Sequence, residues 1–199
     1  MNKAKTFDSS LIKKGIFALV VVAIAGATGA VFAAPNTNQG NGYGNQQAAI
    51  DAVNKLNEGY NTASTNFVNK VSTAVDTASA KLGESKDTDK FAAAFNTSSN
   101  KYYQSVADAR AKFLAAVQQA ANTAESKDQF IDKFNNLKAN YFNELDAAKN
   151  ELANSLSPMG DSANQIKDAF MNSYNSARDM YGNELEVIKN DFANTISNL

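Results

Sequence analysis

A row of apolar residues with an eleven-residue spacing constrains the fold of this chain most strongly. In residues 127–156 the apolar side chains recur at steps of four, three and four residues. Eleven residues make three α-helical turns of about 3.67 residues each, so this row lies on one face of a helix, and the period of two of a β-strand does not fit. The row, which we call the apolar stripe of this segment, consists of Phe130, Phe134, Leu137, Tyr141, Leu145, Ala148, Leu152 and Leu156.

Three further segments carry an apolar stripe of the same kind, which predicts four similar amphipathic helices. We expect helices at about 46–82, 88–124, 127–156 and 162–198. Duplication of one helix is one explanation of this likeness, and common selection for a bundle core is the other. The remaining stripes comprise Ala49, Ala52, Leu56, Tyr60, Ala63, Phe67, Val71, Ala74, Ala78 and Leu82; then Phe91, Phe95, Tyr102, Val106, Ala109, Phe113, Val117 and Ala120; and finally Phe170, Tyr174, Ala177, Tyr181, Leu185, Ile188, Phe192, Ile196 and Leu199.

The connections between these segments are short, and this favours one particular arrangement. No proline interrupts the first three segments, because the chain has only Pro35 and Pro158. Short links make successive helices antiparallel. We therefore predict an all-α fold, an antiparallel up-and-down four-helix bundle of long helices within residues 46–199. Ser126 and Gln129 have the spacing of a capping box at the start of the third helix.

The residue composition excludes most catalytic and metal-binding chemistry. The chain has no cysteine and no histidine, so it has neither a thiolate site nor the commonest general base. A formal net charge of −1 gives no electrostatic reason to expect nucleic acid. Paired carboxylates remain, but we interpret Glu144, Glu151 and Glu184 as members of solvated helix edges that pair with lysine. We therefore expect no enzymatic activity, no catalytic residues, no cofactor and no metal site.

The N-terminal residues have the pattern of a secretory signal. Residues 1–14 carry four lysines and one aspartate, and an uncharged apolar run follows. Val31 and Ala33 are small residues at the −3 and −1 positions of a signal-peptidase site. We predict a signal peptide at residues 1–33 and an extracytoplasmic or secreted location for the rest of the chain.

Two other interpretations of this N-terminus stay open. The apolar residues 15–34 are long enough to serve as an uncleaved membrane anchor. Lys13-Lys14-Gly15 resembles a type IV prepilin cleavage site, although Val20 stands where that family has glutamate. Residues 34–45 are rich in asparagine and glycine and predict a flexible linker to the helices.

A second row of large apolar residues on the two middle helices is the main candidate for a binding surface. Each member follows the apolar stripe by one residue, with the same eleven-residue spacing. If it is exposed, this second row binds a protein partner, another copy of the chain or lipid. Alternatively, the middle helices are more central and need wider apolar faces. The row consists of Tyr103, Leu114, Ile131 and Phe142.

The eleven-residue amphipathic repeats, rich in alanine and asparagine, resemble exchangeable apolipoproteins and stress-related helical repeat proteins. That resemblance implies reversible contact with lipid. Our main hypothesis is an exported, non-enzymatic helical bundle of the cell envelope or extracellular space, acting by protein–protein interaction or self-association, or as a structural scaffold. The alternative is an apolipoprotein-like protein that binds lipid or another hydrophobic ligand.

Overall fold

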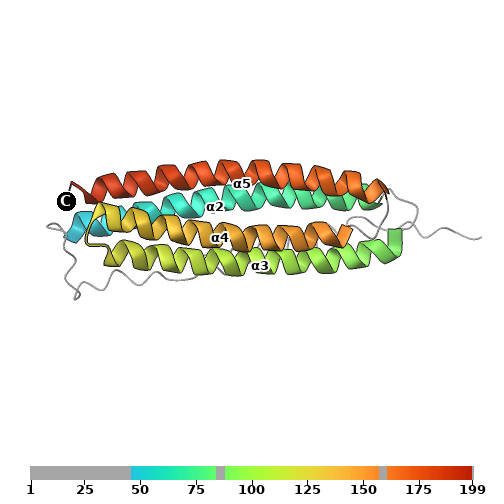
Figure 1. Cartoon of the computed structure of the whole chain (residues 1–199), viewed down its shortest axis with the longest axis horizontal. Helices are drawn as coiled ribbons and strands as arrows, with labels where there is room; N and C mark the ends of the chain where they lie inside the picture. The colour runs from blue at the N-terminus through green and yellow to red at the C-terminus, as the bar shows by residue number, and fades with distance from the viewer. Residues whose placement is uncertain (1–45, 84–87, 157–160, 199) are drawn as a thin grey trace, which may run out of the picture. The chain divides into compact units, whose positions relative to one another are not determined.

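The structure, a computed structural model, describes residues 46–83, 88–156 and 161–198. The predicted signal, anchor and linker lie outside these residues and stay predictions. All secondary-structure elements of the described residues are helices (Figure 1). They are α2 (Gln46–Gly83), α3 (Thr88–Thr123), α4 (Lys127–Leu156) and α5 (Asp161–Ile196), each within two residues of its predicted bounds.

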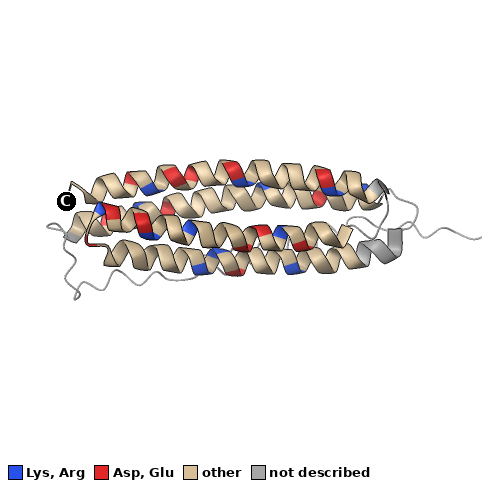
Figure 2. Ribbon diagram, viewed as in Figure 1, with Lys and Arg blue, Asp and Glu red and all other residues tan. Residues whose placement is uncertain are grey.

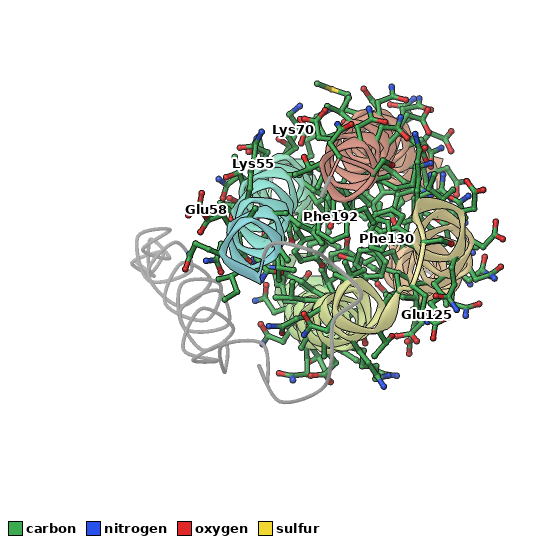
Figure 3. The ribbon with its side chains drawn as sticks, turned by 90° about the vertical axis from the view of Figure 1, so that its left-hand side faces the viewer. Lys55, Glu58, Lys70, Glu125, Phe130 and Phe192 are labelled. Carbon is green, nitrogen blue, oxygen red and sulfur yellow. The ribbon has the colours of Figure 1, made fainter. Side chains whose placement is uncertain are left out.

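The four helices belong to one compact unit of the chain and pack against one another, which confirms the predicted helical fold. Figure 1 shows the chain direction alternating from each helix to the next. Seen along the helices, α2, α3, α4 and α5 surround a common core (Figure 3). The α2–α5 and α3–α4 interfaces are the most extensive, whereas α2–α3 and α4–α5 bring fewer backbone positions close together.

The apolar stripes form this core, as their spacing predicts. Of the stripe residues whose side chains the structure describes, all are buried except Leu137 and Ile188, which are partly exposed. Burial of such stripes, roughly 25 cal/mol per Å² of apolar surface, is the main force that holds amphipathic helices together.

Aromatic rings from different helices meet along the centre of the bundle. Phe113 of α3 stacks on Tyr141 of α4, with ring centroids 4.6 Å apart. Phe130 of α4 and Phe192 of α5 are 4.5 Å apart, and Figure 3 shows both inside the ring of helices. Such ring pairs contribute about 0.5–1.5 kcal/mol each beyond the area that they bury.

The predicted capping box at the start of α4 is formed in a modified way. The Ser126 hydroxyl accepts a hydrogen bond from the Gln129 amide at 3.2 Å. The Gln129 side chain reaches back one residue further than expected and accepts from the Glu125 amide at 2.7 Å. Two backbone N–H groups that the helix itself leaves without a partner are thus satisfied.

Two glycines within helices mark places where a neighbouring side chain comes close to the backbone. A Cβ at Gly59 of α2 would lie 3.2 Å from Cγ1 of Ile188 on α5. A Cβ at Gly182 of α5 would lie 3.3 Å from Cε2 of Phe142 on α4. Glycine costs about 1 kcal/mol relative to alanine in a helix, and close packing accounts for it here.

Candidate functional site

The structure does not present the second row as an exposed strip. Tyr103, Leu114 and Phe142 are only 7%, 6% and 8% exposed, and Ile131 is partly exposed. Tyr103 lies beside Ser72 of α2, whereas Phe142 packs against Gly182 of α5. These side chains therefore serve two different helix interfaces, α2–α3 and α4–α5. Their burial agrees with the wider apolar faces that were the other interpretation, and a role in partner binding stays a prediction.

These two interfaces explain why α3 and α4 need a second apolar row. The α2–α3 and α4–α5 interfaces are the less extensive ones. Large side chains such as Tyr103 and Phe142 fill the space between the helices of these two pairs. The more closely packed pairs, α2–α5 and α3–α4, have no such space to fill. The second row is therefore explained by the distance between neighbouring helices. A more central position of α3 and α4 does not explain it, because these two helices occupy corners of the bundle like the other two (Figure 3).

The centre of the bundle holds a cluster of buried phenols. Tyr60 of α2, Tyr141 of α4 and Tyr181 of α5 lie close enough to change one another's pKa. Burial is the largest cause that raises the pKa of each hydroxyl, because a phenolate loses its hydration. The Tyr60 hydroxyl donates to the backbone carbonyl oxygen of Arg110 at 3.3 Å, whereas the other two make no hydrogen bond of normal length with any described residue.

Arg110 of α3 is the most unusual charged residue of this centre. It is 3% exposed, yet it forms no ion pair with a described residue. Its guanidinium donates to Oδ1 of Asn61 on α2 at 3.4 Å, and its Nε has no partner. A buried cation without a carboxylate normally costs several kcal/mol, so Arg110 weakens the α2–α3 interface.

Charges at the α4–α5 interface lie in partly buried pairs. Oδ2 of Asp146 on α4 lies 3.1 Å from the Arg178 guanidinium of α5, and Oδ1 of Asp146 lies 3.5 Å from Nζ of Lys149. The Arg178 guanidinium covers the Phe142 ring at 4.6 Å, and Lys149 covers the Tyr174 ring at 5.1 Å. Cation–π contacts of this kind contribute about 0.5–2 kcal/mol according to their burial.

A second charged group lies further along the same interface. Glu186 of α5 pairs with Lys138 of α4 and with Lys189 of its own helix. Lys189 also donates to Oδ1 of Asn135 at 3.3 Å. Burial alone raises the pKa of Glu186, but hydrogen bonds from the two lysines outweigh it and hold that pKa below its usual value.

The carboxylates that the sequence singled out do not form an acid–base pair. Glu144 pairs with Lys112 at 3.5 Å and Glu151 pairs with Lys101, both across the α3–α4 interface with largely exposed side chains. Both are the predicted solvated ion pairs. Glu184 is partly exposed and has no ion pair among the described residues.

The described residues also offer little for metals or membranes. Within residues 46–83, 88–156 and 161–198, no three acidic side chains gather in a group that could hold a metal ion. None of these helices has a stretch apolar and long enough to cross a membrane.

No protein-family model matches the chain, and neither curated proteins nor solved structures include one with significant similarity to it.

Proposed function

We propose that this chain is an exported, non-enzymatic, antiparallel up-and-down four-helix bundle. In this proposal it acts at the cell envelope or outside the cell, as a structural scaffold or through contacts with another protein. The support is of two kinds: an N-terminal segment with the pattern of a secretory signal, and a residue composition without histidine or cysteine.

The observation that carries the proposal is the distribution of apolar side chains. The stripes of the four helices turn toward one another, and the second row fills the less extensive interfaces. Among the described residues, only Met180 and Val187 are large apolar side chains in exposed positions, with 47% and 60% of their surface exposed. A bundle with its apolar surface already covered needs no lipid to be stable.

The exterior also favours protein contacts over attraction to a charged polymer or membrane. Acidic and basic residues are interspersed along α4 and α5, without a region of one sign (Figure 2). Several of them already pair across helix interfaces, as Lys101 does with Glu151. Mixed surfaces of this kind suit a scaffold, whereas binding to anionic membranes needs clustered lysine or arginine.

Export is tested by fractionating cells that express the full chain and determining the N-terminal residue of the protein in each fraction. We expect the chain outside the cytoplasm, beginning at Ala34. Recovery of the intact N-terminus in the membrane fraction would support the anchor formed by residues 15–34 instead. Recovery from the cytoplasm alone would contradict export.

The choice between scaffold and lipid carrier is tested by liposome flotation of the exported protein, with circular dichroism on the same samples. We expect the protein to stay unbound and fully helical without lipid. Flotation with increased helicity would favour the apolipoprotein-like alternative, because the bundle would then open and bind through rows such as Tyr103 and Phe142. Flotation of the protein is compared between vesicles of neutral lipid and vesicles of anionic lipid.

A further inference from the structure

A groove between α2 and α5 differs from the other helix interfaces. Its volume is about 220 Å³. Its apolar lining comes from Leu56 on α2 and from Ile188 and Phe192 on α5, and Leu56 and Phe192 are each 3% exposed. Charged side chains of Lys55, Glu58 and Asp191 border it, and Figure 3 shows Lys55 and Glu58 on the outer side of α2.

The groove depends on Gly59, which lies in its wall. Any larger residue at this position would bring a Cβ to 3.2 Å from Ile188 Cγ1 and take up part of the space. Alanine would strengthen the helix by about 1 kcal/mol through its intrinsic propensity. Glycine thus lets the Ile188 side chain of α5 pack closely against α2 at the wall of the groove.

The charges around the groove are unpaired, in contrast to those of two other interfaces. Lys55, Glu58 and Asp191 form no ion pair and no side-chain hydrogen bond with any described residue. Charges on the α3–α4 and α4–α5 interfaces pair across the helices, as Lys112 does with Glu144. At this groove one cation and two carboxylates from both helices stay available to a ligand.

We propose that this groove binds a small zwitterion with an apolar body, of the size and chemical class of an aromatic or branched α-amino acid. A cavity of about 150 Å³ holds a benzene ring, so this groove has room for one such side chain. The apolar body packs on Ile188 and Phe192. Glu58 and Asp191 receive the ammonium group, and Lys55 pairs with the carboxylate.

The test uses the full exported protein and three aromatic probes with different charged groups: L-phenylalanine, which carries both, phenethylamine, which has an ammonium but no carboxylate, and phenylacetate, which has a carboxylate but no ammonium. Binding is followed by NMR shifts of the Gly59, Ile188 and Thr195 amides. We expect saturable shifts with L-phenylalanine. Replacing Glu58 by Gln and Asp191 by Asn together should weaken the binding of L-phenylalanine and phenethylamine by about fivefold, the effect expected of exposed ion pairs. The binding of phenylacetate should change less.

Lys55→Met is the complementary variant. It should weaken the binding of phenylacetate and L-phenylalanine but not that of phenethylamine. Thr195→Leu should block the groove and abolish saturable binding of all three probes. The Thr195 hydroxyl donates only to the Asp191 carbonyl oxygen of its own helix, at 2.8 Å, so this change breaks no contact between helices. Asp132→Asn on the exposed side of α4 is the matched control and should change nothing.

Three results would overturn the proposal: no saturable shifts at these amides, undiminished binding by a folded Thr195→Leu variant, or self-association of the protein through the same amides. Thermal melts establish that each variant is folded. Because the proposal concerns a small ligand, its failure leaves the scaffold function untouched.

Discussion

The α4–α5 and α2–α3 interfaces solve the same packing problem with different polar residues. Each is less extensive than its two neighbours, and each is filled by a second-row aromatic, Phe142 in one and Tyr103 in the other. At α4–α5 the cations have carboxylate partners, as the partly exposed Arg178 has Asp146 at 3.1 Å. At α2–α3, Arg110 has an amide oxygen of Asn61 and no carboxylate.

The spacing of apolar residues alone therefore does not set the strength of a helix interface. Buried charges are stabilising only when they are paired, and an uncompensated one subtracts from the apolar gain. We infer that α2–α3 is the weaker interface and that α4–α5 holds the bundle in register.

High pH should break both interfaces at once and gives the largest expected effect. The pKa of every tyrosine in the described residues is raised, that of Tyr103 to about 12, chiefly by burial. Phenols in the unfolded chain lose protons near pH 10, so stability is fully present below that pH and is lost as the pH rises above it. Tyrosinate absorbance and the helical circular dichroism signal should change in one transition. Phenols that titrate near pH 10 in an intact helical protein would contradict this.

Phe142→Ala should cost about 3 kcal/mol of unfolding free energy, because it removes a buried ring from the α4–α5 interface. The ring centroids of Phe142 and Tyr181 are 6.0 Å apart, and the Arg178 guanidinium covers the Phe142 ring. Urea denaturation measures the loss, and Phe142→Leu should lose less than half as much. A loss below about 1 kcal/mol would mean that this ring is not part of the core.

Asp146→Ala should destabilise the protein by about 2 kcal/mol, less than a fully buried pair because its side chain is 31% exposed. The substitution leaves Lys149 without a carboxylate and Arg178 with only the exposed Asp179, 3.9 Å away. Asp132→Ala, an exposed residue of the same helix, should stay within about 0.5 kcal/mol of the original chain. A double-mutant cycle with Arg178→Met isolates the pair, and a coupling energy of zero would refute the role given to Asp146.

Arg110→Met should raise the unfolding free energy by about 1 kcal/mol, since it removes a buried charge that has no carboxylate. Arg178→Met should lower it, because that guanidinium is paired. These opposite signs, measured by urea denaturation of both variants, are the sharpest test of the comparison. If Arg110→Met destabilises as much as Arg178→Met, the two interfaces do not differ in the way proposed.

Acid should weaken the α4–α5 interface but not the α2–α3 interface, and this is the smallest of the expected effects. The folded pKa of Glu186 is lowered, so its contribution is present above about pH 4.3, the unfolded value, and is lost as the pH falls through the folded pKa. With 37% of its side chain exposed, the contribution at pH 7 should be under about 1 kcal/mol. Glu186→Gln should therefore be less stable than the original chain at pH 7 and equal to it in strong acid. A difference that does not depend on pH would contradict this.

Much of the fold could be predicted from spacing alone because a stripe of fixed period can be buried only on one helix face. The ends of α4 were predictable as well, since Ser126 and Gln129 carry a local capping signal. The role of the second row was not predictable. Whether Tyr103 and Phe142 face solvent or a neighbour depends on how far apart the helices lie, and no local pattern encodes that distance.

The burial of polar residues in the core could not be predicted from the sequence either. Ser64 and Ser99 lie where small polar residues usually line a helix edge, yet they are 0% and 2% exposed. Lys149 and Lys189 appear as ordinary surface lysines in the sequence, although both are buried in the structure. Lys149 lies over the Tyr174 ring of α5, and Lys189 donates to Oδ1 of Asn135 on α4. Only the packed structure brings these partners on a neighbouring helix within reach of the long side chains.

Four long helices, the apolar residues that they bury and the lack of histidine and cysteine can be derived from the sequence, because these follow from a repeat of eleven residues and from residue types. Which helix pairs lie close, which charges meet and where the groove beside Gly59 lies can be learned only from the packed helices. Those features depend on how each helix is rotated and spaced against the others, and contacts between residues far apart in the chain set both.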